Sequence, residues 1–135
     1  MELVVDASIV AKWFLEEERR KETEVLRQDH LKKKIKLLAP ALLLFELGNL
    51  LITKKTISPT EAKEGLAALL KMEIGLFLFE EDDLGFWMEQ SRKRNISAYD
   101  ASYLALAKRL GCDFLTADKK LYEKLKSLKF VKFLG

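Results

Sequence analysis

The chain has 135 residues, of which 49% are hydrophobic and 33% charged, with only 2 Pro and 6 Gly. This composition excludes a disordered or low-complexity chain and predicts one globular domain over residues 1–135. The formal net charge of +3 fits a nucleic-acid partner without requiring one. Cys112 is the only cysteine, which excludes an intrachain disulfide, and a single Cys with a single His excludes a zinc site built from those residues.

Three features of the sequence predict a cytoplasmic protein that does not contact a membrane. The first residues enter a predicted strand directly and show no signal-peptide cleavage pattern. The apolar stretch 37–52 is interrupted by Pro40 and Glu46, which favours a buried helix over a membrane span. A lone cysteine is typical of a reducing compartment.

The predicted elements alternate between strands and helices. Residues 3–5 are apolar and end at Asp6, and a helical spacing of apolar residues begins at Ser8, so a short buried strand precedes a helix. This alternation predicts an α/β fold with a central parallel sheet of about five strands and helices on both faces. The predicted strands are 3–5, 35–39, 76–79, 114–116 and 130–133, and the predicted helices are 8–15, 17–33, 41–55, 58–72, 84–94, 97–110 and 118–125.

Two central helices have distinct sequence patterns. The helix over 41–55 is apolar on nearly every side, so we expect it to be buried in the core. Ser58-Pro59-Thr60-Glu61 supplies an N-cap, a proline at the first helical position and a capping-box glutamate. Gly75 is expected to end the helix that starts there, and Pro40 is expected to stop the strand over 35–39.

Four carboxylates lie at strand ends or within apolar helices. Asp6 and Asp118 each follow a predicted strand, at the edge where open α/β sheets bind ligands. Glu46 and Asp100 lie in apolar helices, and an unpaired buried carboxylate costs several kcal/mol. Two such charges ~4 Å apart repel by roughly 4 kcal/mol at an effective dielectric near 20. If the four converge, they need protons or divalent cations, and oxygen-only ligands favour Mg²⁺ or Mn²⁺.

Each carboxylate also has a purely structural interpretation. Asp6 and Asp118 are suitable helix N-caps, and Asp100 follows Ser97 at the spacing of a capping box. Glu46 is compatible with an outward orientation or with a pair to a distant Arg. Only the conjunction of the four residues favours a shared site.

Four short segments that contain these carboxylates follow one another along the chain. They are Val4-Val5-Asp6-Ala7-Ser8, Phe45-Glu46-Leu47-Gly48-Asn49, Ser97-Ala98-Tyr99-Asp100-Ala101 and Leu115-Thr116-Ala117-Asp118. In this order and spacing they resemble the PIN-domain ribonucleases, and most of all the VapC-type toxins of toxin–antitoxin pairs. The resemblance implies a metal site of Asp6, Glu46, Asp100 and Asp118. It also implies that Ser8 and Thr116 orient the carboxylates and a water, and that Asn49 supports them.

The resemblance further implies an endoribonuclease that hydrolyses RNA phosphodiester bonds with one or two Mg²⁺ or Mn²⁺ ions. It implies the toxin of a type II toxin–antitoxin system, with RNA, a cognate antitoxin and a second copy of the chain as partners. Trp13, Phe14 and Leu15 are candidates for the apolar groove that receives the antitoxin. The candidate phosphate contacts are Lys12, Lys54, Lys55, Arg92, Lys93, Arg94, Lys119 and Lys120, with Lys12 and Lys119 nearest in sequence to the carboxylates.

Two other functions remain open on the sequence. One is a non-catalytic PIN-like module that binds RNA or protein. The other is a Mg²⁺-dependent phosphatase or phosphoryl-transfer domain, which fits poorly because Ala7 and not a second acid follows Asp6. No Gly-rich phosphate loop supports a nucleotide-binding class. His30 and Cys112 are expected to be structural or surface residues, not parts of a nucleophilic pair.

Overall fold

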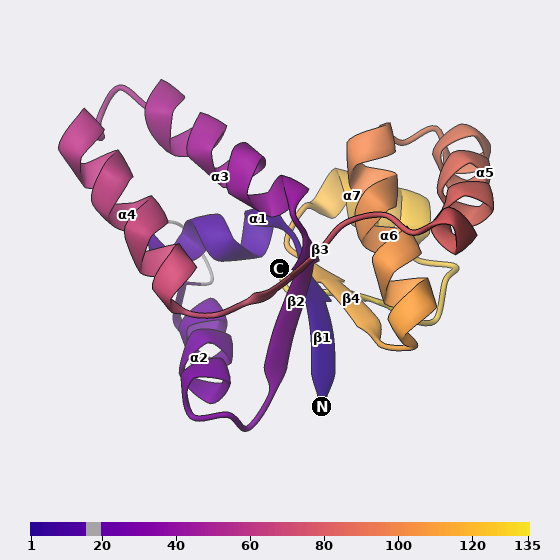
Figure 1. Ribbon diagram of the computed structural model, residues 1–135. Helices are drawn as coiled ribbons and strands as arrows, with labels where there is room; N and C mark the ends of the chain where they lie inside the picture. The colour runs from indigo at the N-terminus through magenta and orange to yellow at the C-terminus, as the bar shows by residue number, and fades with distance from the viewer. Residues whose placement is uncertain (16–19) are drawn as a thin grey trace.

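The structure is a computed structural model that describes residues 1–15 and 20–135. Its strands form one five-stranded sheet in the order β3-β2-β1-β4-β5, with every neighbouring pair parallel (Figure 1). The strands are β1 (Glu2–Val5), β2 (Lys36–Pro40), β3 (Gly75–Phe77), β4 (Asp113–Thr116) and β5 (Val131–Phe133). The predicted parallel α/β sheet is confirmed.

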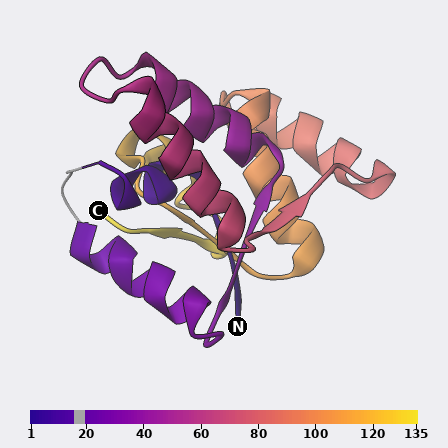
Figure 2. The same cartoon turned by 60° about the vertical axis from the view of Figure 1, so that its left-hand side comes forward.

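Helices cover both faces of the sheet, as predicted. One layer contains α1 (Ala7–Val10), the 3-10 turn η1 (Ala11–Trp13), α2 (Arg20–Leu31), α3 (Leu42–Thr53) and α4 (Pro59–Lys71). The other contains α5 (Leu84–Arg94), α6 (Ala98–Leu110) and α7 (Lys119–Leu125), and the 3-10 turn η2 (Glu81–Asp83) leads into α5 (Figure 1). Figure 2 brings the first layer forward and shows α2 and the α3–α4 hairpin in front of the sheet.

The two layers follow from the order of the strands. The chain moves from β1 to β2 to β3 in one direction and then returns across the sheet to β4 and β5. Because parallel crossovers are right-handed, this reversal places the later helices on the opposite face. The inner strands are therefore buried on both sides, and Val4, Val5, Leu37 and Phe114 are all fully buried. This burial explains why residues 3–5 are continuously apolar.

Both ends of α4 match the helix predicted over 58–72, but Gly75 is not the residue that ends it. Ser58 accepts a hydrogen bond from the Glu61 N–H, and the Glu61 side chain accepts one from the Ser58 N–H, which completes the capping box. The chain then turns at Glu73, whose φ is 58°. Gly75, expected to end this helix, is the first residue of β3. A Cβ there would lie 2.7 Å from a methyl carbon of Leu38, so Gly75 permits the close approach of β3 to β2.

Helix α3 is less buried than its composition suggested. Leu43, Leu47 and Leu51 form one buried stripe at four-residue spacing. Phe45 is 75% exposed and Ile52 is 72% exposed, so a second apolar face points outward. The expectation of a helix buried all round is wrong, because α1, α4 and β2 together cover only one side of it.

The remaining boundaries differ in small ways from the predictions. The helix predicted over 8–15 is the short α1 followed by η1, and residues 17–19 of the next predicted helix lie outside the described residues. The strand was expected to end at residue 39, before Pro40, but Pro40 is the last residue of β2. No helix in the described part of the chain combines the length and apolar character of a membrane span.

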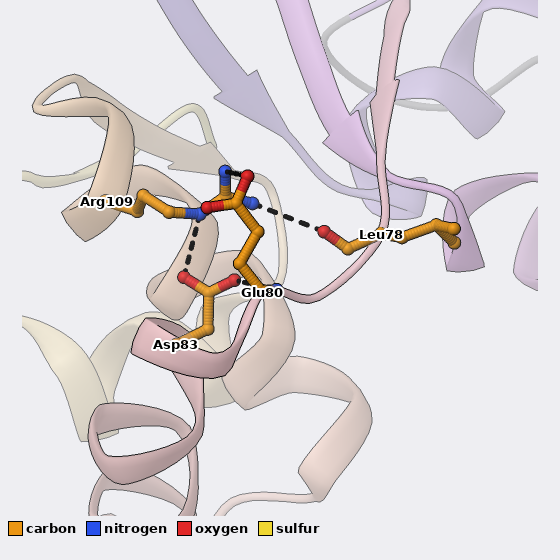
Figure 3. A network of polar contacts seen from close by, with 4 residues as sticks. All are labelled: Leu78, Glu80, Asp83 and Arg109. Carbon is orange, nitrogen blue, oxygen red and sulfur yellow. Dashed lines mark hydrogen bonds and ion pairs between the residues drawn. The ribbon is translucent and has the colours of Figure 1, made fainter.

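Arg109 of α6 holds the loop between β3 and α5 against the second helical layer (Figure 3). Its guanidinium contacts Asp83 at 2.8 Å and Glu80 at 3.0 Å, and it donates a hydrogen bond of 3.3 Å to the Leu78 carbonyl. Asp83 is buried and also accepts a hydrogen bond from the Glu80 N–H. This polar network fixes a loop whose Leu78 side chain is 79% exposed.

Candidate active site

Asp6 lies just beyond β1, at the point in the sheet where the connections from neighbouring strands lead in opposite directions. The chain leaves β1 toward β2 and leaves the adjacent β4 toward β5, so this edge is a topological switch point. Asp6 is 7% exposed, and its Oδ1 accepts hydrogen bonds from the Ser8 N–H at 3.0 Å and from the Ile9 N–H at 3.4 Å. Asp6 is thus the N-cap of α1, one of the two roles that its position predicted.

The two predicted hydroxyl residues both contact Asp6. Thr116, the last residue of β4, is fully buried and donates a hydrogen bond of 2.6 Å to Asp6 Oδ2. The Ser8 hydroxyl donates to Asp6 Oδ1, and the Ser8 and Thr116 oxygens lie 3.3 Å apart. Both oxygens of the Asp6 carboxylate are therefore held by residues that lie 108 positions apart in the sequence.

Asp118 lies two residues beyond Thr116 and is exposed. Its N–H donates to Thr116 Oγ1 at 3.1 Å, and its Oδ1 accepts a hydrogen bond of 3.1 Å from the Leu121 N–H. Asp118 is the N-cap of α7, as its structural interpretation expected. The second carboxylate oxygen accepts no hydrogen bond from the described residues.

Asp100 lies in the first turn of α6 and is half-buried. The Ser97 hydroxyl accepts a hydrogen bond of 3.0 Å from the Asp100 N–H, so Ser97 is the N-cap of this helix. Burial raises the pKa of Asp100, the Ser97 contact lowers it, and the negative charge of Asp118 raises it. Asp100 and Asp118 are therefore close enough to repel each other.

Glu46 reaches the same region from α3 and is half-buried. It is not paired with an Arg among the described residues, and its Oε1 accepts a hydrogen bond of 2.5 Å from the Tyr103 hydroxyl. Burial raises the pKa of Glu46, the Tyr103 contact lowers it, and the charge of Asp100 raises it. Tyr103 was missed in the sequence because a buried aromatic in an apolar helix indicates core packing. Its position three residues after Asp100, on the same side of α6, was the available signal.

The four carboxylates share one electrostatic neighbourhood, although they do not converge on one point. Burial raises the pKa of Asp6 from the ordinary 3.8 to about 6, against the opposing effect of its hydrogen bonds. The charges of Asp6, Glu46 and Asp100 all raise the pKa of Tyr103, so all three carboxylates lie within electrostatic reach of its hydroxyl. Among residues 1–15 and 20–135, no three His, Cys, Asp or Glu side chains are grouped at metal-binding spacing. Unneutralised oxygen donors nevertheless suit a hard divalent cation, which would draw them together.

The predicted supporting residues lie at the border of this site. Asn49 is exposed on α3, one turn after Glu46. Lys119 and Lys120 are exposed and begin α7 directly after Asp118. Lys124, which the sequence did not single out, donates a hydrogen bond of 2.8 Å to the Asn95 carbonyl, and its positive charge lowers the pKa of Asp100.

His30 and Cys112 have no place in this site. His30 is buried, its Nδ1 accepts a hydrogen bond of 3.1 Å from the Leu37 N–H, and its Nε2 lies 2.7 Å from the Met72 carbonyl. Burial raises the pKa of the Cys112 thiol, which is the reverse of what activates a nucleophile. His30 is therefore a buried structural residue, and Cys112 is a half-buried residue that packs against the core.

The fold and its acidic edge define an α/β protein with a candidate metal site at the switch point between β1 and β4. The PIN domain family matches residues 3–126, so the chain belongs to the PIN domain family. No curated protein sequence matches this chain.

Several solved structures have the same fold. PAE2754 from Pyrobaculum aerophilum is 22% identical, with a TM-score of 0.71 over 98% of this chain and 90% of that one. VapBC2 from Rickettsia felis, bound to a DNA fragment from its promoter, is 12% identical, with a TM-score of 0.73 over 100% of both chains. VapBC-1 from nontypeable Haemophilus influenzae is 13% identical, with a TM-score of 0.68 over 99% of this chain and 97% of that one. At these identities the likeness establishes the fold alone.

Proposed function

We propose that this chain is a single PIN domain over residues 1–135 and a cytoplasmic, Mg²⁺- or Mn²⁺-dependent endoribonuclease. One observation carries the proposal: Asp6, Glu46, Asp100 and Asp118 come from four separate segments, their charges act on one another or on the Tyr103 hydroxyl between them, and none forms an ion pair with the described residues. Such a cluster of carboxylates repels itself unless it is protonated or neutralised. A function that uses a divalent cation accounts for this arrangement.

Each polar residue of the site has a role in this proposal. Asp6, Glu46, Asp100 and Asp118 would hold the cation. A divalent ion in such a site supplies an activated water for attack on phosphorus and neutralises charge on the leaving oxygen. Ser8 and Thr116 fix the orientation of Asp6 through the hydrogen bonds described above. Two exposed lysines at the start of α7, Lys119 and Lys120, are placed to contact RNA phosphates.

The test is cleavage of a mixed RNA pool with and without Mg²⁺ or Mn²⁺. Asp100→Asn should reduce metal-dependent cleavage by at least 100-fold, because it removes one charged ligand. Asp82→Asn is the matched control, since Asp82 is exposed in η2 and is not part of the acidic site. Cleavage by Asp100→Asn at the wild-type rate would refute the site, and RNA binding without cleavage would favour a non-catalytic PIN-like module.

We further propose that the chain is the toxin of a type II toxin–antitoxin system, with a cognate antitoxin as its partner. The support is that proteins of the same fold include the VapBC complexes. Phe14 is half-buried and lines a cavity between η1, α2 and α4, whereas Trp13 and Leu15 are each 6% exposed, belong to the core and are not available to a partner. Expression of the chain alone should arrest bacterial growth, and Asp100→Asn should restore it. Unimpaired growth with confirmed soluble expression would contradict the toxin assignment.

A homodimer is the last part of the proposal, and an apolar groove of about 290 Å³ supports it. The groove runs between the start of α3, the β3–α5 loop and the start of α6, and Trp87 and Tyr99 are on its walls. Leu78, Phe79 and Tyr99 line this same groove and are 79%, 44% and 64% exposed, so they form one exposed patch of the kind that a partner covers. Leu78→Glu should convert a dimer into a monomer in light scattering. A wild-type monomer at micromolar concentration would rule out the dimer.

A further inference from the structure

Tyr103 connects the two helical layers at the acidic site. It lies in α6 one turn after Asp100, and its side chain is 1% exposed. Its ring stacks on Phe114 of β4, with ring centroids 5.7 Å apart and an interplanar angle of 18°. Its hydroxyl donates to Glu46 of α3, which belongs to the opposite layer (Figure 1). One side chain thus reaches across the carboxyl edge of the sheet.

Toward an ionised Glu46 carboxylate the Tyr103 hydroxyl can act only as a donor, because the carboxylate has no proton to give. Burial is the main reason that the pKa of Tyr103 lies well above its usual range, and the contact with Glu46 adds to this effect. The charges of Asp6 and Asp100 raise it further. Because the ring is packed against Phe114, the phenolic oxygen has a fixed position. Its O–H group donates a hydrogen bond to Oε1, one of the two carboxylate oxygens of Glu46.

Glu46 depends on this contact more than its neighbours depend on theirs. Asp6 is held by two hydroxyls and two backbone N–H groups, whereas the described residues give Glu46 a single hydrogen bond, from Tyr103. The residues one turn away on α3 are Leu42, Leu43, Asn49 and Leu50, and none of them, the exposed Asn49 included, donates a hydrogen bond to Glu46. A flexible glutamate in an apolar helix therefore has one fixed partner.

We propose that Tyr103 is a positioning residue, which holds Glu46 by Oε1 in the acidic site so that Oε2 stays available to a divalent cation. This inference rests on the proposed function, because it requires a cation at that site. Partners that orient metal ligands are typically worth 10- to 100-fold in metal affinity. Loss of the Tyr103 hydroxyl should cost an amount in that range.

The test compares Mn²⁺ binding by the full chain in the wild type, Tyr103→Phe and Tyr122→Phe. Tyr103→Phe removes one oxygen and keeps the ring on Phe114. Tyr122 is a matched control because it also stacks on an aromatic ring, that of Phe133 at 5.1 Å, but its hydroxyl donates to no carboxylate among the described residues. Electron paramagnetic resonance of free Mn²⁺ should show about 10- to 100-fold weaker binding by Tyr103→Phe alone. In a Glu46→Gln background, Tyr103→Phe should cause no further loss of Mn²⁺ affinity.

A second measurement needs no metal and remains informative if Tyr103→Phe folds poorly. A buried hydroxyl that donates to a carboxylate at 2.5 Å should give a slowly exchanging, downfield proton resonance in the metal-free wild type. The resonance should persist in Tyr122→Phe and disappear in Glu46→Gln, which keeps the phenol but loses the charged acceptor. Its absence from the wild type would overturn the contact on which the inference depends.

The outcomes separate this inference from the proposed function. Equal Mn²⁺ affinity of the wild type and Tyr103→Phe would overturn the positioning role and leave the metal-dependent nuclease intact. Failure of the wild type to bind Mn²⁺ would overturn the proposed function, and the role of Tyr103 toward a cation with it. A loss of affinity in Tyr103→Phe that persists unchanged in the Glu46→Gln background would show that Tyr103 acts by a route other than Glu46.

Discussion

The Thr116 hydroxyl donates a hydrogen bond of 2.6 Å to Asp6 Oδ2 and thereby ties the end of β4 to the end of β1. The register of the two strands produces this contact, because Val5 pairs with Leu115 and the next positions along each strand are Asp6 and Thr116. The same Thr116 oxygen accepts a hydrogen bond from the Asp118 N–H. One buried hydroxyl therefore joins two of the candidate metal ligands.

Thr116→Val should destabilise the protein by about 1–3 kcal/mol and reduce RNA cleavage, because it leaves Asp6 Oδ2 without a donor and the Asp118 N–H without an acceptor. Thr116→Ser keeps the hydroxyl and should retain most of the cleavage. Thr53→Val is the control, since the Thr53 hydroxyl is exposed and bonds only to carbonyls of its own helix. Denaturant unfolding measures the stability of each variant. Equal losses of stability in Thr53→Val and Thr116→Val would show that the buried hydrogen bonds of Thr116 contribute no more than an exposed one.

The buried Asp6 carboxyl should make the metal-free protein less stable as the pH rises. Its pKa is about 6 in the folded chain against an ordinary 3.8, so the folded state binds a proton more tightly than the unfolded state does. The stabilising contribution is therefore complete below about pH 4 and is lost as the pH rises through about 6. A difference of this size corresponds to at most about 3 kcal/mol.

Asp6→Asn isolates that effect, since it removes the titrating group and keeps a similar shape. In EDTA, the stability of Asp6→Asn relative to the wild type should rise between pH 4 and pH 7, as measured by denaturant unfolding at a series of pH values. Added Mg²⁺ or Mn²⁺ should stabilise the wild type at pH 7 and have little effect on Asp6→Asn. A stability difference that does not change with pH would show that Asp6 titrates normally in the fold.

The sequence predicted the residues at strand ends better than those on helices. The position of Asp6 follows from the strand pattern alone, because carboxyl ends of parallel strands meet at one edge, whereas the role of Thr116 was implied only by the resemblance to PIN domains. The exposure of Phe45 could not be predicted in this way, since an all-apolar helix does not indicate which face the neighbouring elements will cover. The role of Gly75 was also hidden, because it depends on how closely Leu38 approaches from the adjacent strand.

The partner of Glu46 shows why the site was only partly predictable. A glutamate in an apolar helix predicts that some polar group must meet it, but does not predict which one. The partner, Tyr103, lies 57 residues away on the other layer, and its aromatic ring gives the same sequence signal as a core residue. Likewise, the interaction of Arg109 with Asp83 depends on the path of the β3–α5 loop, which the local sequence does not determine.

Arg109→Met should destabilise the protein by about 3 kcal/mol, because it leaves the buried Asp83 carboxylate without its cation. Lys63→Met is the control, since Lys63 is exposed on α4 and a change there should stay within about 0.5 kcal/mol. Denaturant unfolding followed by tryptophan fluorescence is suitable because Trp87 lies in α5, which follows the loop. The double variant Arg109→Met/Asp83→Leu should recover part of the loss, since both charges are then removed. An unchanged free energy of unfolding in Arg109→Met would mean that Arg109 contributes little to holding the loop.

Lys119 should contribute to RNA binding mainly through electrostatic attraction. It is exposed at the first position of α7, next to Asp118, so its ammonium group is placed to meet a phosphate that approaches the acidic edge. For a single phosphate contact, Lys119→Ala should weaken binding similarly for all RNA sequences and lower the slope of log K against log salt by about 1. Lys71→Ala is the control, because Lys71 ends α4 near the opposite edge of the sheet. Fluorescence anisotropy in EDTA between 50 and 300 mM KCl, roughly the range over which salt screens phosphate contacts, measures the slope for the wild type and for each variant. Identical slopes for the wild type and both variants would place the RNA-binding surface away from the start of α7.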